Sequence, residues 1–130
     1  MPREARPSEA TLTLPAWALF VREPFAERII SGRKTWEIRT RPTDRRGRIA
    51  IVSHRGLIGT VDLYDVEGPL RLADLVGQVG KHRAPLRLLQ TYAAGRALYA
   101  WALREPARLD PPIVLRRGRG PVVWFKLKPA

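Results

Sequence analysis

The sequence contains no cysteine, and only two of its 130 residues are histidines. Without cysteine, the chain has no disulfide, no thiolate nucleophile and no zinc site with sulfur ligands. The two histidines, His54 and His82, lie far apart in the sequence, which disfavours a zinc site made by protein side chains alone. We therefore expect neither a metal nor another cofactor.

Long apolar runs are also missing. No segment approaches the ~20 apolar residues that a membrane-spanning helix needs. The first ten residues are polar and contain proline, and they lack the apolar core of a signal peptide. We predict a cytoplasmic protein with no membrane partner. Its organisation is expected to be a loose tail over residues 1–11 and one domain over residues 12–130.

Acidic residues are scarce relative to basic ones. The chain has 12 Asp and Glu against 24 Lys and Arg, which gives a net charge of +12. Such a charge on a small domain predicts a polyanionic partner, usually nucleic acid. The alternative is background composition, because arginine far outnumbers lysine and asparagine is absent, as biased codon usage or a hot habitat would produce. Arginines cluster in two places, at Arg41, Arg45, Arg46 and Arg48 and at Arg116, Arg117 and Arg119.

The most informative segment is the octet of residues 32–39, which reads Gly-Arg-Lys-Thr-Trp-Glu-Ile-Arg. Its glycine closes a helical pattern, and a strand pattern follows. Side chains alternate between the two faces of a strand, so Glu37 and Arg39 share one face while Trp36 and Ile38 share the other. We predict that Trp36 and Ile38 enter the core and that the two charged side chains are presented together.

Lys34 stands at the start of this strand, close to Glu37 and Arg39. One acid between two bases can bind or activate a polar ligand. The planar fork of Arg39 matches a phosphate or a carboxylate, and Glu37 can accept hydrogen bonds from a base amino group or act as a general base. The alternative is a solvated strand that carries a salt bridge, and spacing alone leaves both open.

Two further pairs are candidates for the same site. Ser53 and His54 end an apolar strand that is expected near the octet, and their alternative is a turn-capping serine beside a surface histidine. Lys81 and His82 fall in an expected loop between two helical patterns, where they would rim a cleft or simply face water.

Strand patterns outnumber helical patterns along the chain. We expect strands over residues 18–22, 34–39, 48–53, 57–66, 97–103 and 121–127. Helices are expected from Pro24 to the stop at Gly32 and over residues 70–76 and 85–94, and a proline-rich segment over residues 106–112. This pattern predicts an α+β fold in which a small β-barrel of about five or six strands closes and two or three helices flank it. Core positions are expected for Trp36, Tyr99, Trp101 and Trp124, with base stacking as the alternative.

The octet resembles the signature of the ASCH domain family, Gly-x-Lys-x-x-Glu-x-Arg, in which Gly32, Lys34, Glu37 and Arg39 fill every fixed place. The resemblance continues in order on both sides. It includes residues 19–26, Gly47 with the strand that ends at Ser53-His54, residues 101–103, Pro112-Ile113 and Gly120 with Trp124. It covers roughly residues 17–127.

Membership of this family implies a PUA-like barrel, and many such barrels bind RNA. Some members are amidohydrolases acting on acetylated cytidine, and others resemble ribonucleases. The amidohydrolase branch has a threonine where Glu37 stands and a glutamate shortly after a Lys-His pair. Here residues 83–86, which follow Lys81-His82, contain no carboxylate.

The resemblance therefore implies an RNA- or nucleotide-binding domain with a basic cleft. The alternative is a small metal-independent hydrolase, a ribonuclease or an acetylcytidine amidohydrolase, with Lys34 and Glu37 as catalytic groups. The oligomeric state stays open. The expected binding residues are Lys34, Glu37, Arg39, Arg41, Arg45, Arg46, Ser53, His54, Lys81 and His82.

Overall fold

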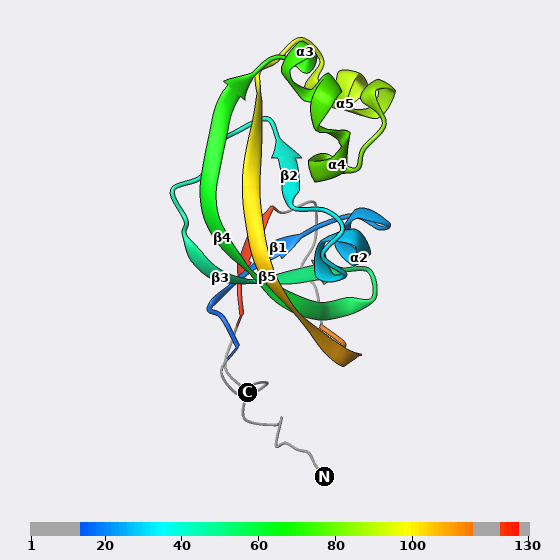
Figure 1. Ribbon diagram of the computed structural model, residues 1–130. Helices are drawn as coiled ribbons and strands as arrows, with labels where there is room; N and C mark the ends of the chain where they lie inside the picture. The colour runs from blue at the N-terminus through cyan, green and yellow to red at the C-terminus, as the bar shows by residue number, and fades with distance from the viewer. Residues whose placement is uncertain (1–13, 116–122, 128–130) are drawn as a thin grey trace.

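The computed structural model describes residues 14–115 and 123–127. Six strands form one sheet in the order β2-β5-β4-β3-β1-β6 (Figure 1). The expected positions 121 and 122 of the last strand, the residues 1–11 and the second arginine cluster lie outside the described residues. The strands are β1 (Trp17–Phe20), β2 (Trp36–Arg39), β3 (Gly47–Ser53), β4 (Gly56–Leu70), β5 (Leu98–Ile113) and β6 (Trp124–Lys126).

The sheet is strongly curved, but within the described residues it does not close, so the expected closed barrel is not confirmed. Within the described residues, β2 pairs only with β5 and β6 pairs only with β1, which leaves these two strands at the ends of the sheet. A side chain spans the gap instead, since Nη2 of Arg39 on β2 donates a 2.9 Å hydrogen bond to the carbonyl oxygen of Phe20 on β1.

The longest strand, β5, continues past residue 103, where the expected strand ends, and runs through the proline-rich segment. Pro106, Pro111 and Pro112 all lie within β5. The partner strand β2 pairs only with residues 99–102 of β5, so the far part of β5 has β4 on one side and no described strand on the other. Prolines are tolerated there because their missing amide hydrogens leave no ladder bond unmade.

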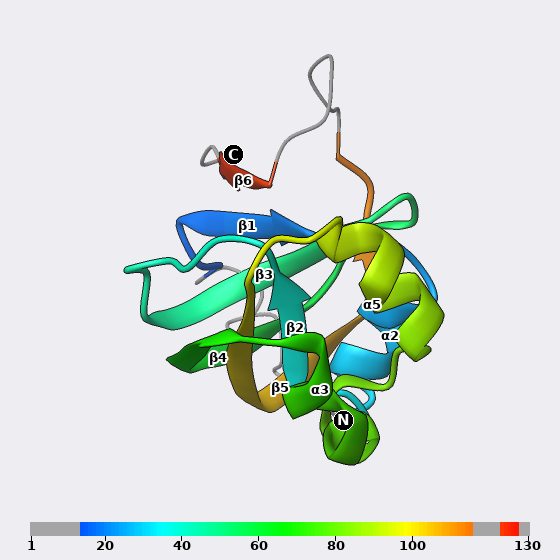
Figure 2. The ribbon, with the colours of Figure 1, turned by 90° about the horizontal axis from the view of Figure 1, so that it is seen from above.

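Short helices occupy one side of the curved sheet (Figures 1 and 2). They are α2 (Phe25–Ile30), α3 (Leu72–Leu75), the 3₁₀ turn η2 (Val76–Gln78), α4 (Val79–His82) and α5 (Leu86–Ala93). The helix α4 stands where we expected a loop at Lys81-His82. None of the helices in the described part of the chain is long and apolar enough to cross a membrane.

Two apolar clusters lie beneath these helices. Ala26, Ile29 and Ile30 of α2 pack with inward side chains of β1, β3, β4 and β5. Leu89 and Ala93 of α5 pack with Leu75, Trp36 and Ile38 in the second cluster. The helices α2 and α5 are therefore fixed on either side of β2, the strand that carries the octet.

Close approach of β4 to its neighbours explains why position 59 is a glycine. A side-chain carbon at this position would lie 2.5 Å from the carbonyl oxygen of Ala107 and 2.8 Å from Cδ1 of Ile30. The pairing of β4 with β5 also shifts register between Leu57 and Gly59. Glycine is thus required for β4 to pass beneath α2.

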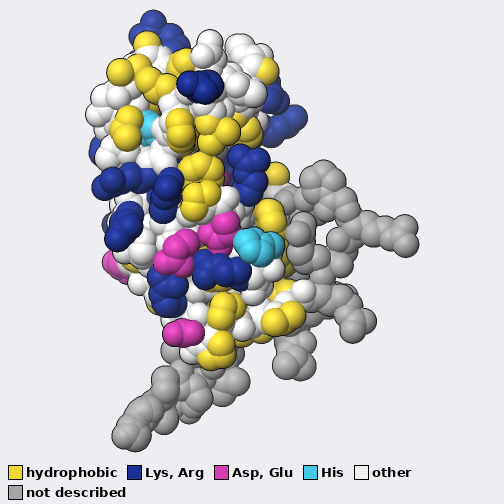
Figure 3. Space-filling model, turned by 90° about the vertical axis from the view of Figure 1, so that its right-hand side faces the viewer, with side chains coloured by type: hydrophobic (Ala, Val, Ile, Leu, Met, Phe, Trp, Pro, Cys, Tyr) yellow, Lys and Arg dark blue, Asp and Glu magenta, His cyan; other side chains and the backbone are white. Residues whose placement is uncertain are grey.

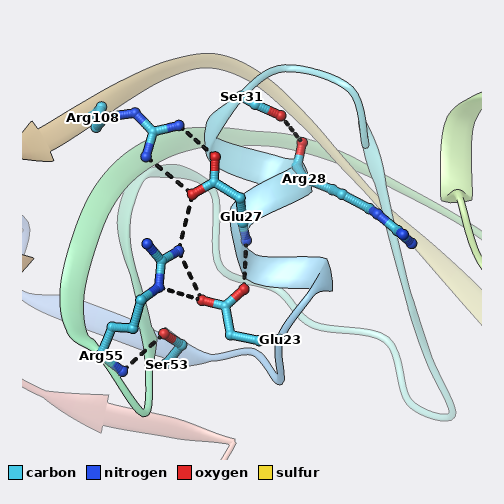
Figure 4. A network of polar contacts seen from close by, with 7 residues as sticks. All are labelled: Glu23, Glu27, Arg28, Ser31, Ser53, Arg55 and Arg108. Atoms are coloured by element: carbon cyan, nitrogen blue, oxygen red, sulfur yellow. Dashed lines mark hydrogen bonds and ion pairs between the residues drawn. The ribbon is translucent and has the colours of Figure 1, made fainter.

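An ion-pair network holds the outer face of α2 against the sheet (Figure 4). Glu27 accepts hydrogen bonds from Arg108 of β5 at 2.6 and 3.0 Å, and one from Arg55 at 2.9 Å. Arg55 also donates to Glu23, 2.9 Å away. The hydrogen bond from Arg108, supported by Arg55, lowers the pKa of Glu27 to about 2.

Candidate functional site

Lys34, Glu37 and Arg39 line one cavity of about 720 Å³, and the alternation along the octet accounts for Glu37 and Arg39. Trp36 and Ile38 are each only 6% exposed, and both pack in the cluster beneath α5. The backbone amide of Lys34 is bonded to the carbonyl of Arg28 in α2 and that of Thr35 to the carbonyl of Lys81 in α4. The octet is therefore anchored on both sides before its strand begins.

The ammonium group of Lys34 is buried, with only 2% of the side chain exposed. Nζ donates a 2.5 Å hydrogen bond to the carbonyl oxygen of His82, lies 3.5 Å from Oε1 of Glu37 and sits 5.2 Å from the centre of the Phe25 ring. Burial lowers the pKa of Lys34, and the nearby carboxylate of Glu37 opposes that shift.

Glu37 and Arg39 form a second, tighter pair. Nε of Arg39 donates to Oε2 of Glu37 at 2.9 Å, and Nη2 lies at the same distance from that oxygen. Arg39 also donates to the carbonyl of Phe20, so most donors of its guanidinium group are already bonded within the protein. Arg39 therefore orients the carboxylate, and Oε1 of Glu37, on the side of Lys34, is the oxygen less occupied by protein donors.

The remaining cavity walls are mostly apolar and come from elements on both sides of the gap between β2 and β1. Phe25 of α2 and the side chains of Leu88, Leu89 and Tyr92 of α5 face the cavity. Tyr92 is 39% exposed, so it stands at the mouth. The other lining residues are Phe20, Val21, Arg22, Ile38, Ala84, Thr91 and Val123.

His82 does not line the cavity but supports it from behind. The imidazole is fully buried; its Nε2 pairs with the carbonyl oxygen of Leu75 at 2.9 Å and its Nδ1 accepts a bond from the amide of Ala84 at 3.1 Å. Burial lowers the pKa of His82, and Lys34 lowers it further. With both nitrogens used, the histidine joins α3 to α4 and holds the carbonyl that binds Lys34.

Lys81 is exposed, and its ammonium nitrogen lies 4.6 Å from the centre of the Trp36 ring. It therefore covers the outer face of the buried tryptophan and is not among the cavity-lining residues.

Ser53 and His54 stand apart from the cavity, at the turn between β3 and β4. Oγ of Ser53 accepts the amide hydrogen of Arg55 at 3.2 Å. Burial alone would raise the pKa of Glu23, but hydrogen bonds, including one with Ser53, lower that pKa below its usual value. His54 is exposed in the turn. The structure thus places these two residues as a capping serine and a surface histidine, next to the ion-pair network of α2.

The arginines after the octet differ from one another. Arg45 is half-buried, with its guanidinium carbon 3.6 Å from the centre of the Trp17 ring and 5.0 Å from that of Trp124. Arg46 is exposed and bonds only to the backbone oxygens of Thr43 and Arg45. Arg41 is exposed as well. Of the three, Arg45 packs against tryptophan rings of the protein, whereas Arg41 and Arg46 face solvent.

Trp101 and Trp124 extend this packing to the cavity. Their rings stack with centres 5.6 Å apart, and the guanidinium of Arg39 lies 5.8 Å from the centre of the Trp101 ring. Trp101 is buried and donates its indole hydrogen to the carbonyl of Arg41. Trp101 therefore has the core position expected of it, whereas Trp124 is half-buried and packs against the core from outside.

Sequence reasoning missed the wall formed by α5. In the helix predicted over residues 85–94, helical spacing places Leu86, Leu89 and Ala93 in one apolar stripe. Leu88 and Tyr92 lie outside that stripe and face the cavity. The sequence did contain a signal, because this helix has more apolar residues than one stripe holds. Apolar residues on a second face of a helix need a surface or a ligand of their own to pack against. Figure 3 shows this side of the molecule, where Lys and Arg side chains surround hydrophobic ones.

Comparison with known proteins agrees with this architecture. Solved structures of the ASCH protein from Zymomonas mobilis align with a TM-score of 0.72 at 24% sequence identity, covering 86% of this chain and 87% of that one. A single-substitution variant of the same protein aligns equally well and is covered over 89% of its length. A search of the curated proteins finds no match. The family model for the ASCH domain matches residues 19–113, and the chain therefore belongs to the ASCH domain family.

Proposed function

We propose that this domain binds RNA, or a nucleotide, by taking one unpaired base into the cavity around Lys34, Glu37 and Arg39. The observation that carries the proposal is a buried donor–acceptor pair, Lys34 and Glu37, inside a cavity with aromatic and aliphatic walls. Small-molecule sites typically combine apolar walls with a few placed polar groups in a volume of about 300–1,000 Å³.

The polar pair suits the edge of a nucleobase. Lys34 spends one N–H on the carbonyl of His82 and one toward Glu37, which leaves its third for a base carbonyl or ring nitrogen. Oε1 of Glu37 can accept from a base amino or imino group beside it. Every nucleobase offers a donor next to an acceptor on its pairing edge, so this pair alone holds a base without choosing among them.

The walls and the surface charge supply the rest of the binding. Phe25 and Tyr92 are aromatic faces at the wall and the mouth, on which a base can stack. Arg22 is exposed at the cavity and the net charge of the chain is +12, which favours the phosphates of the strand. Arg41 and Arg46 extend the exposed positive surface beyond the octet.

Binding of single-stranded RNA, followed by fluorescence anisotropy, tests the proposal. Lys34→Ala should weaken binding by about 1–3 kcal/mol, the scale of a hydrogen bond to a charged group. Lys126→Ala removes the same charge from an exposed position on β6 and should change affinity little. Equal losses of RNA affinity in the two variants, with both still folded, would show that RNA binds to the positive charge of the protein and not in the cavity.

A hydrolase using the same cavity is the second candidate. It is favoured by the 3.5 Å separation of a buried amine and a buried carboxylate that both line the cavity, an arrangement that can transfer protons. Neither histidine lines the cavity, so acid–base chemistry there would fall to Lys34 and Glu37.

A further inference from the structure

The amine of Lys34 is a potential nucleophile that can be reached only through the cavity. Its side chain is 2% exposed, and it is one of the cavity-lining residues. Lys81 and Lys126, the other lysines in the described residues, are both exposed. A buried amine with a lowered pKa supplies more of the neutral, reactive form near neutral pH than an exposed one does.

We propose that Lys34 captures a planar aromatic or heterocyclic aldehyde as an imine inside this cavity. The proposal does not depend on nucleic-acid binding, because it needs only the amine, its neighbours and the shape of the cavity.

The reaction balances without an oxidant or a reductant. The ammonium of Lys34 passes one proton to Oε1 of Glu37, 3.5 Å away, and the neutral amine attacks the carbonyl carbon of the aldehyde. One nitrogen proton of the adduct then moves to its oxygen to give a hydroxyl, and Glu37 returns its proton to that hydroxyl. Water leaves as the nitrogen lone pair forms the carbon–nitrogen double bond, and one N–H stays on the nitrogen. The net change converts one aldehyde and one ammonium into one protonated imine and one water.

The surroundings of Lys34 suit the product as well as the reactant. A protonated imine keeps the positive charge and one N–H of the original ammonium. Glu37 therefore keeps its counter-ion, the carbonyl of His82 keeps a donor, and the Phe25 ring keeps a cation above its face. Arg28 of α2 and Arg39 of β2 also act on Lys34, and both disfavour the charged form of the free amine.

The cavity indicates what kind of aldehyde fits. Its walls are Phe25, Leu88, Leu89 and Tyr92, which favour a flat apolar ring, and Arg22 at its edge favours an anionic substituent. A volume of about 720 Å³ accommodates one ring with a phosphate. Pyridoxal 5′-phosphate has this chemistry, and benzaldehyde is its uncharged counterpart, so both serve as probes.

The test uses the wild-type protein with each probe and cyanoborohydride, which reduces an imine to a stable amine. Peptide mapping by mass spectrometry then gives the labelling rate at every lysine. Burial lowers the pKa of Lys34 and so raises the fraction of its amine that is neutral, and the cavity holds the aldehyde beside it, so Lys34 should label faster than Lys81 or Lys126. Labelling of Lys34 at the same rate as those two, or slower, would overturn the proposal.

Three controls complete the experiment. Lys34→Arg should abolish the fast label, whereas Lys81→Arg should leave it unchanged. Unfolding in urea should bring all lysines to one rate, because the advantage belongs to the folded cavity. A fast label that survives in Lys34→Arg or in urea would also contradict the proposal. Since no RNA is present, a failure of RNA binding would not affect these results.

Discussion

Nζ of Lys34 lies 3.5 Å from Oε1 of Glu37, and both side chains are almost completely buried while they line an open cavity. A buried pair of charges is costly to desolvate and is retained only when further bonds satisfy it. Here the carbonyl of His82 binds the ammonium and Arg39 binds the other carboxylate oxygen. The protein therefore maintains an oriented donor and acceptor where a ligand can reach them.

Salt should weaken RNA binding steeply, because phosphate contacts release counter-ions. Arg46→Glu should weaken binding similarly for all sequences and reduce the magnitude of the slope of log affinity against log salt by about 1 or more. Arg46 is the better target than Arg45, which packs on Trp17 and whose loss would disturb the fold. Anisotropy titrations at several salt concentrations measure the slope. Arg71→Glu, the same change elsewhere, should have the smaller effect, and a flat salt response would contradict the prediction.

Hydrolysis should be slow or absent. We expect no acetate release from acetylcytidine, because residues 83–86 bring no carboxylate to the cavity and Ala84 is the one among them that lines it. Cleavage of a labelled mixed-sequence RNA should also be slow or undetectable, since His54 lies outside the cavity. Product analysis by chromatography checks both reactions. Rapid acetate release that disappears in Lys34→Ala would instead establish an amidohydrolase, because loss of a catalytic group acts mainly on turnover.

His82 should be far more important for stability than His54. His82→Ala removes a fully buried ring and leaves two backbone partners unsatisfied, which should lower the free energy of unfolding by about 2–4 kcal/mol. His54→Ala, at an exposed turn, should change it by less than about 0.5 kcal/mol. Urea unfolding of both variants provides the comparison. Similar small effects would mean that the links from α3 to α4 do not depend on the imidazole.

Acid should weaken the attachment of α2 to the sheet. Because the folded-state pKa of Glu27 is lowered from 4.5 to about 2, the unfolded chain binds its proton first. The stabilisation is complete above pH 4.5 and is lost as the pH falls from there towards 2. Glu27→Gln should flatten the fall in stability over that range, as measured by urea midpoints at several pH values. Glu67→Gln, an exposed carboxyl outside the network, should retain the wild-type pH dependence.

The octet shows how much of the candidate site could be predicted from a sequence pattern. Its two-residue period predicted that Trp36 and Ile38 are buried and that Glu37 and Arg39 are presented together, because strand geometry is local. The order of strand and helix patterns predicted the α+β fold. The closed barrel is not confirmed, because closure depends on contacts between elements far apart in the sequence, and among the described residues β2 reaches β1 only through the side chain of Arg39.

Other features depended on contacts that the sequence does not show. The prolines of β5 indicated a break, but a strand can carry proline where its neighbour has ended. His82 was expected at the rim of a cleft, yet its burial results from packing among Leu75, Ala84 and Lys34, which are remote or unremarkable in the sequence. Leu88 and Tyr92 line the cavity because α5 lies across it from Phe25, a placement that the sequence alone does not show.

Chemical-shift mapping of the isotopically labelled protein, titrated with a short single-stranded RNA, tests the central proposal most directly. We predict saturable shifts of the signals of Phe25, Lys34, Glu37 and Tyr92, with Lys126 unchanged. Shifts confined to exposed arginines, with the signals of these four residues unmoved at saturation, would contradict a binding site in the cavity.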